Sequence, residues 1–209
     1  MGDRVAVLKD GELQQVAPPE ILYAAPDNTF VAAFTGSPSM NLVEGDLEQD
    51  DVGGTGTLSV VLGPQRLLLP PELLAARPAL GSYAGRKVIV GIRAEAMDDA
   101  SVDRLEDGPA GTLQGVVERR EALGAEVLAH VEIEARPVVT EDVRQLAAVS
   151  DEAVVEKLDH QAAVGRAVVV ARFDPRSRVR VGDEVTLAVR TDHLHFFDFD
   201  SGLAIRGGS

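Results

Sequence analysis

Short runs of apolar residues, some alternating with polar residues and some continuous, follow one another along most of this sequence. They are rich in valine, leucine and isoleucine. Turns with glycine or proline separate many of them at spacings of roughly 8–12 residues, the pattern of an all-β barrel or sandwich. The runs predict strands at 5–8, 13–17, 40–48, 55–63, 65–70, 86–93, 111–123, 125–135, 166–173, 183–190 and 193–199. The predicted fold class is therefore mainly β.

The first two runs predict a β-hairpin, because Asp10-Gly11 stands between them. This dipeptide favours a type I′ turn, in which both central residues need positive φ. An isolated two-stranded hairpin is marginally stable in water, so its apolar face needs a cover. We expect the hairpin either to fray or to be ordered by packing against the helices that follow or, preferentially, against a second copy of the chain.

Two short helices are predicted between the hairpin and residue 36. Pro18 and Pro19 stand where a helix start tolerates a missing N–H, and Pro26 ends the first helix. Asp27 or Asn28 is expected to cap the second helix. Helical spacing places three of its side chains on one face, and we expect this helix to dock on the strand-rich part: Phe30, Ala33 and Phe34.

The stretch from Glu141 to Ala163 departs from the strand pattern. It is acidic, rich in alanine and composed largely of helix-forming residues. We expect a helical insertion that lies on the surface, outside the barrel.

The acidity of the chain limits its partners. Twenty lysines and arginines against 34 aspartates and glutamates give a formal charge of −14 over 209 residues. Nucleic acids and anionic lipids need a basic face, so neither is expected as a partner. There is no cysteine, which excludes disulfides and thiolate metal sites. No run approaches the ~20 apolar residues of a membrane span, and we expect a soluble cytoplasmic protein without direct membrane insertion.

Few residues suggest chemistry. The glycine-rich stretches 53–59 and 81–88 lack the spacing of phosphate loops and are better explained as turns. His193 and His195 alternate on one predicted strand, with aspartates nearby, and imidazole with carboxylate is a ligand set for zinc or iron. The alternative is a closing strand whose histidines face water or cap a turn. Because only two imidazoles are available there, we favour this alternative and expect no metal and no cofactor.

An ordered series of motifs resembles the ATP-binding subunits of maltose-type carbohydrate ABC importers. Residues 1–45, which include the hinge GSPSMN, resemble the passage from the end of the nucleotide-binding domain into the C-terminal regulatory region. VIVGIRAEAM is similar to the motif G-[IV]-R-P-E-H of that family. The V-x-E-x-L-G-x-E hairpin of the family is similar to VVERREALGAEVLAHVEI. The family's closing segment is similar to RVRVGDEVTLAV together with HFFDFDSGLAI. The resemblance covers nearly the whole chain.

The resemblance implies a domain division and a set of motif positions. Residues 1–36 would be the tail of an ATPase domain, and residues 37–209 a TOBE or OB-like regulatory barrel that carries the insertion at 141–163. The motif positions matched in this sequence are Gly36, Pro38, Met40, Asn41, Arg93, Glu95, Gly124, Glu126, Gly182 and Asp183. Two positions depart from the family pattern: Ala94 stands in place of the usual proline, and Ala96 in place of the usual histidine.

The resemblance also implies a function. None of the catalytic ATPase motifs of the family is expected in this chain, which would be a regulatory and dimerisation domain rather than an enzyme. Its partners would be a second copy of itself, its own ATPase domain and through it the permease subunits, and a cytoplasmic regulator, at the inner face of the plasma membrane. The alternative is a barrel that senses a small metabolite or oxyanion, for which the sequence offers no evident basic cluster.

Overall fold

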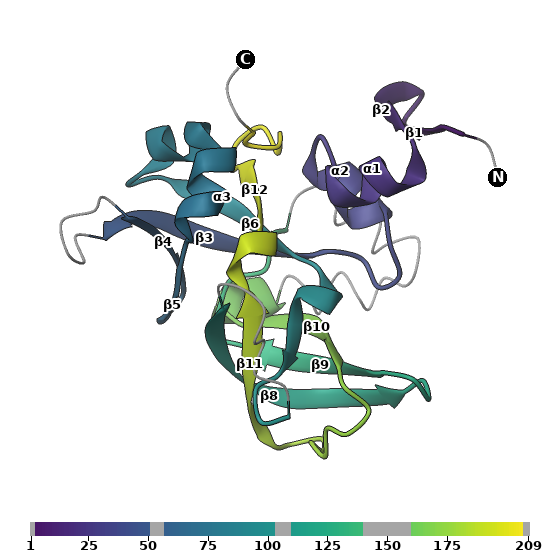
Figure 1. The fold of residues 1–209 in the computed structure, drawn as a ribbon, viewed down its shortest axis with the longest axis vertical. Coiled ribbons are helices and arrows are strands. Elements are labelled where there is room, and N and C mark those ends of the chain that lie inside the picture. Colours follow the sequence, from purple (N-terminus) through teal and green to yellow (C-terminus); the bar gives the residue numbers. More distant parts are fainter. Residues whose placement is uncertain (1–2, 51–56, 103–109, 140–159, 207–209) are drawn as a thin grey trace.

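Two five-stranded antiparallel sheets form most of the molecule in a computed structural model that describes residues 3–50, 57–102, 110–139 and 160–206 (Figure 1). In order across the first sheet, the strands are β12 (His195–Asp198), β6 (Lys87–Ile92), β3 (Asn41–Asp50), β4 (Thr57–Leu62) and β5 (Gln65–Leu68). In the second sheet they are β10 (Ala167–Phe173), β9 (Val127–Ile133), β8 (Ala110–Ala122), β11 (Glu184–Arg190) and β7 (Met97–Asp99). The predicted mainly β fold class is confirmed.

The main core lies where the two sheets pack together. Strands β9 and β10 bury every second side chain, as their alternating sequences predict. The predicted inward face of β9 is confirmed, since Val127, Ala129, Val131 and Ile133 are all buried. Side chains of the first sheet, such as Leu47, join the same apolar cluster. We refer to the two sheets together as the two-sheet body.

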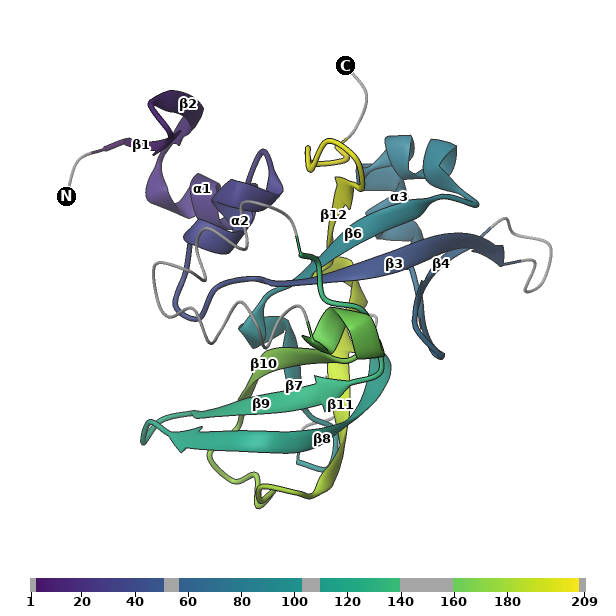
Figure 2. The same cartoon turned by 180° about the vertical axis from the view of Figure 1, so that it is seen from behind.

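The N-terminal hairpin and helices lie at one end of this body, as both views show (Figures 1 and 2). The hairpin pairs β1 (Val5–Lys9) with β2 (Glu12–Ala17), and Asp10 and Gly11 have φ values of 50° and 85°. Both are positive, as the predicted turn requires. Helix α1 spans Pro19–Ala24 and helix α2 spans Thr29–Phe34. Asn28 caps α2, because its Oδ1 accepts a hydrogen bond from Val31 N at 2.9 Å.

The predicted buried face of α2 is wrong. The buried side chains of this helix are Thr29, Val31 and Ala32, whereas Phe34 is 60% exposed and stacks on Phe30. The helix is only six residues long, and it is packed on two sides: Val31 faces the hairpin, and Ala32 faces the two-sheet body. Spacing identified three residues that share a face, but it could not identify which faces would be covered.

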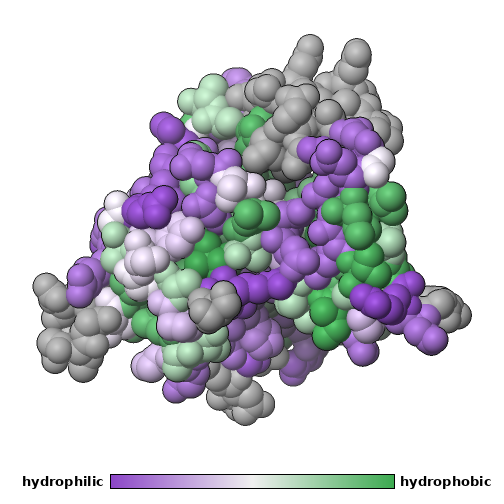
Figure 3. Space-filling view, turned by 90° about the horizontal axis from the view of Figure 1, so that it is seen from above, coloured by the Kyte–Doolittle hydropathy of each residue, from purple (hydrophilic) through white to green (hydrophobic). Residues whose placement is uncertain are grey.

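The hairpin packs against its own helices, through Val7 and Ala17 on one side and Leu22 and Val31 on the other. This is one of the predicted arrangements; pairing with a second copy stays a prediction. Apolar side chains remain exposed over the hairpin and helices, at Val5, Leu8, Leu13, Ile21 and Phe34. Figure 3 shows hydrophobic surface at this side of the molecule.

The remaining elements are short. They are helix α3 (Pro71–Ala76) and the 3-10 helices η2 (Pro78–Tyr83), η3 (Ala94–Ala96) and η4 (Thr191–His193). Of the predicted insertion at 141–163, residues 141–159 lie outside the described residues; the helical turn at 160–164 contains the buried Gln161. Within the described ranges, no helix has the length and apolar character needed to cross a membrane. The predicted boundary at residue 36 stays a prediction.

Candidate functional site

Arg93 joins the two N-terminal helices to the two-sheet body. It follows the last residue of β6, and only 4% of it is exposed. Its Nη1 donates a hydrogen bond to the carbonyl oxygen of Thr35 at 2.5 Å, and its Nη2 donates to that of Tyr23 at 2.6 Å. Thr35 is the C-cap of α2, and Tyr23 lies in the last turn of α1. Carbonyl groups at helix C-termini lack helical partners and attract cations, so one guanidinium stabilises the ends of both helices.

Tyr23 connects Arg93 to the second motif position on this loop, Glu95. The Arg93 guanidinium stacks over the Tyr23 ring, 3.9 Å from its centroid. The Tyr23 hydroxyl donates a hydrogen bond to Glu95 Oε1. Burial, together with this hydrogen bond and the Glu95 charge, raises the pKa of Tyr23 to about 12, so the phenol stays protonated as the donor at neutral pH. Burial lowers the pKa of Arg93 below its usual value.

Gly36 lies directly beside this stack. Its φ is 110°, and a Cβ there would lie 2.9 Å from the Tyr23 ring and 3.0 Å from Arg93 Nη1. Any other residue would therefore be strained and would displace the stack. The chain continues through Pro38, after a cis Ser37–Pro38 bond, to Met40, which is buried against Ile89 and Phe197.

Asn41 connects the two sheets. Its Nδ2 donates to the carbonyl oxygens of Ile92 on β6, at 2.9 Å, and Val170 on β10, at 3.0 Å. Its Oδ1 accepts from Val170 N at 2.7 Å. The amide thus imitates a backbone peptide group between strands that belong to different sheets. The GSPSMN hinge therefore begins at Gly36, directly beside the Tyr23–Arg93 stack, and is hydrogen-bonded to the second sheet through Asn41.

The other predicted motif positions lie in turns of the second sheet. Gly124 has a φ of 86° in the β8–β9 turn, and Glu126 Oε2 lies 2.9 Å from Arg172 Nε on β10. Gly182 has a φ of 90°, and Asp183 Oδ2 accepts from Arg180 N at 2.8 Å. The contacts of these four residues are those of local turns and a strand-to-strand ion pair. Ala94 and Ala96, at the two departures from the family pattern, are both buried in η3.

The prediction that His193 and His195 alternate on one strand is wrong, because only His195 lies in a strand. His193 ends the 3-10 helix η4 and has a side chain that is 57% exposed, 3.6 Å from Asp192 Oδ2. His195 begins β12 and is mostly covered. Burial, followed by the charges of Arg77 and Arg93, lowers its pKa to about 3, so its imidazole is neutral at physiological pH. Among the residues that the structure describes, no three potential ligands come together to hold a metal.

A basic cluster surrounds His195, although none was evident in the sequence. Arg77 Nη1 donates to the carbonyl oxygen of Leu194 at 2.5 Å, and Arg206 Nη1 lies 2.6 Å from Asp27 Oδ1. Together with Arg93, these arginines contribute to the lowered pKa of His195. The residues are far apart along the chain and belong to different elements, so no local pattern could have revealed the cluster.

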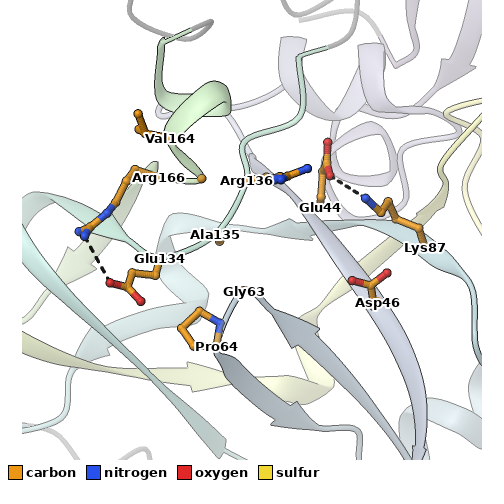
Figure 4. Close-up of a pocket in the computed structure, with 11 residues that line it drawn as sticks. Glu44, Asp46, Gly63, Pro64, Lys87, Glu134, Ala135, Arg136, Val164 and Arg166 are labelled. Atoms are coloured by element: carbon orange, nitrogen blue, oxygen red, sulfur yellow. Dashed lines mark hydrogen bonds and ion pairs between the residues drawn. The ribbon is translucent and has the colours of Figure 1, made fainter.

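Apart from the cluster around His195, a hollow of about 560 Å³ lies between the two sheets (Figure 4). Lys87 Nζ lies 3.1 Å from Glu44 Oε2 on one side of it, and Arg166 Nη2 lies 3.3 Å from Glu134 Oε1. Asp46 and Arg136 also line it, which gives three acidic and three basic side chains in all. This cleft is therefore balanced in charge.

Comparisons with known proteins agree with the order of the motifs. Residues 36–97 match the MalK OB fold domain, and residues 90–155 match the TOBE domain. The chain is 33% identical over 206 residues to the uncharacterized ABC transporter ATP-binding protein YurJ of Bacillus subtilis, with 98% of this chain and 46% of that protein aligned. It is 34% identical over 205 residues to the trehalose/maltose import ATP-binding protein MalK of Thermococcus litoralis, which covers 98% of this chain and 45% of that protein.

A third relative is the trehalose import ATP-binding protein SugC of Mycobacterium tuberculosis, 34% identical over 206 residues, with 97% of this chain and 47% of that protein aligned. The chain thus spans about half the length of the curated relatives it matches. Among solved structures, the cytoplasmic molybdate-binding protein ModG with molybdate bound matches with a TM-score of 0.44 and 14% identity, over 75% of this chain and 94% of that one. That likeness is too distant to carry an argument.

Proposed function

We propose that this chain, which belongs to the family of sugar ABC importer ATP-binding subunits and resembles their C-terminal OB and TOBE region, acts as a regulatory and dimerisation module. The observation that carries the proposal is the ordered match of both domains, which together span residues 36–155. The module holds two copies of an ATP-binding subunit near each other. Such tethering raises the effective concentration of one copy for the other without new contacts at the nucleotide site.

The junction at Arg93 supports this proposal. Two guanidinium hydrogen bonds, the stack on Tyr23 and the Tyr23–Glu95 hydrogen bond join the N-terminal helices to the two-sheet body. The C-terminal turn adds backbone contacts, since Thr29 N donates to Gly202 O and Ala204 N donates to Asp27 O, each at 2.9 Å. A movement of the helices in an intact subunit would therefore carry the two-sheet body with it.

The partners that follow from this proposal are a second copy of the chain, an ATPase domain, permease subunits reached through that domain, and a cytoplasmic regulator. The location is the cytoplasmic face of the plasma membrane. The chain itself needs no cofactor and no metal, and it does not hydrolyse ATP.

Two measurements on the purified chain test the proposal. Magnesium-dependent release of phosphate from ATP should not exceed that of a buffer blank, and sustained turnover that persists through successive purification steps would contradict it. In cells that express a tagged and an untagged copy, affinity purification of the tagged copy should retain the untagged one. Recovery of the tagged copy alone would contradict the dimerisation part of the proposal.

A second candidate function is the sensing of a small ligand, and the charged cleft in Figure 4 favours it. Its volume falls within the range of ligand pockets, roughly 300–1,000 Å³. Alternating carboxylates and cations can hydrogen-bond a neutral polar molecule. A thermal-shift screen with sugars, sugar phosphates and oxyanions tests this second function, because a ligand that binds only the folded state raises the unfolding temperature. A rise that Arg136→Gln removes would come from this cleft.

A further inference from the structure

Two small hollows open on either side of Arg77 and His195, at the seam between helix α1 and the two-sheet body. Their volumes are about 310 Å³ and 260 Å³, and both are lined by Ala24, Arg77 and His195. The first hollow also exposes Arg93, and the second Arg206. These hollows are distinct from the cleft in Figure 4, with which they share no lining residue.

The seam contains two largely buried guanidinium groups without a carboxylate partner. Arg77 donates to the Leu194 carbonyl oxygen, and Arg93 donates to carbonyl and hydroxyl oxygens of Tyr23 and Thr35. Within the described ranges neither forms an ion pair, and the buried Nε of Arg93 has no hydrogen-bond partner. Buried charges are normally paired, because the loss of hydration is costly.

The acidic side chains around the seam do not neutralise these two charges directly. Asp27 pairs with Arg206, and Asp192 lies 3.2 Å from Arg190 Nη2 and 3.6 Å from His193 Nε2. Glu95 accepts the Tyr23 hydroxyl and attracts Arg93 electrostatically, but it makes no ion pair with it. Glu95 and Asp192 line the larger hollow together with Arg77 and Arg93, so that hollow is balanced in formal charge. The charged side chains that line the smaller hollow are Arg77 and Arg206, and because Arg206 pairs with Asp27, it is the charge of Arg77 that has no carboxylate partner there.

We propose that the seam formed by Arg77, Arg93 and His195 binds the phosphate group of a small metabolite. Guanidinium groups bind phosphate through charge-assisted hydrogen bonds in a planar, paired geometry. The neutral His195 imidazole supplies one further N–H donor, and the hollows have room for a phosphate and a few carbon atoms. Because the seam lies between α1 and β12, a bound phosphate strengthens the contact between the helices and the two-sheet body. The proposal rests on this geometry alone and does not require the chain to dimerise.

Isothermal titration at constant ionic strength tests the proposal on the whole chain. Inorganic phosphate and glucose 6-phosphate are compared with glucose, which lacks the anion. We expect saturable binding of both phosphates with one site per chain, and none of glucose. In Arg77→Gln the affinity should fall about tenfold or more, the effect of one charge-assisted hydrogen bond. The matched control is Arg136→Gln, which removes a guanidinium from the cleft of Figure 4 and should leave binding unchanged.

A second variant keeps the test decisive if Arg77→Gln does not fold. Ala24 lines both hollows at the exposed end of α1, so Ala24→Glu adds a carboxylate without removing a buried contact. Circular dichroism should show that this variant is folded, and phosphate binding should be lost. Absence of saturable phosphate binding to the unmodified chain would overturn the proposal. So would full affinity in Ala24→Glu, or binding that Arg136→Gln removes instead.

Discussion

The Arg93 guanidinium lies 3.9 Å from the centroid of the Tyr23 ring, and its Nη2 donates a hydrogen bond to the carbonyl oxygen of the same residue at 2.6 Å. One residue thus holds its partner through both ring and backbone. The contact connects two motifs that are 70 positions apart in the sequence. It explains why an arginine stands directly after β6, and why glycine is needed at position 36.

Arg93→Ala should lower the free energy of unfolding by about 3 kcal/mol, because it removes the stack and leaves buried carbonyl groups without donors. Arg93→Lys should restore little, because a single ammonium cannot replace the forked donors. Urea unfolding measures the change. The matched control is Arg86→Ala: Arg86 stacks on Tyr83 at 4.6 Å but is half exposed, so its loss should cost less than about 1 kcal/mol. Equal costs for the two substitutions would contradict this account of Arg93.

Asn41→Asp should destabilise the fold by about 2 kcal/mol. The substitution removes the amide donor that serves Ile92 and Val170 and directs a carboxylate at two carbonyl oxygens. In the control Asn28→Asp, the side chain keeps an oxygen that accepts from Val31 N, so the cap survives and the cost should stay below about 1 kcal/mol. Urea unfolding of both variants gives the comparison. An unchanged stability of Asn41→Asp would show that the bridge between the sheets is dispensable.

Gly63→Ala should cost about 3 kcal/mol, and Gly124→Ala only about 1 kcal/mol. Both glycines have positive φ, so both substitutions introduce backbone strain. Only at Gly63 would the new Cβ also overlap a backbone atom, the Glu134 carbonyl oxygen, whereas Gly124 has open space around it. Thermal unfolding separates the two contributions. If both variants lost the same stability, the close approach of the β4–β5 turn to the end of β9 would be wrong.

The stability of the fold should depend on pH through His195. Its pKa is about 3 in the folded chain, below the ordinary value of 6.5, so the unfolded chain takes up the proton first. The stabilisation by the neutral imidazole is thus complete above pH 6.5 and is lost progressively as the pH falls toward 3. Between pH 7.5 and pH 5, the free energy of unfolding of the unsubstituted chain should fall by about 2 kcal/mol more than that of the His195→Gln variant. Urea unfolding at both pH values checks this, and parallel losses would place His195 in contact with solvent.

Much of the fold could be predicted from the sequence, because strand alternation and turn chemistry are local. The inward face of β9 and the positive φ at Asp10 and Gly11 followed directly from the residue order. Strand β7, with three residues, is too short to show a period, and the exposed face of α2 depended on what covers the helix.

The candidate site was only partly predictable. Motif resemblance identified Arg93 and Glu95, but not their partner Tyr23, because that contact forms only when distant segments pack together. Nothing in the sequence was a reason to select Arg77, which is a single arginine before a proline. Its place in the candidate site depends on its position beside His195 in the folded chain. Their spacing suggested that the two histidines share a strand face. The 3-10 helix η4 ends at His193, however, so this side chain is exposed whereas His195 is largely covered.

Sedimentation equilibrium of the purified chain, from micromolar to submillimolar concentration, tests most directly the central claim that this module pairs with a second copy. The proposed function predicts an average mass that rises with concentration from that of one chain, 22.1 kDa, toward twice that value. A mass that stays at 22.1 kDa over the whole range would contradict it.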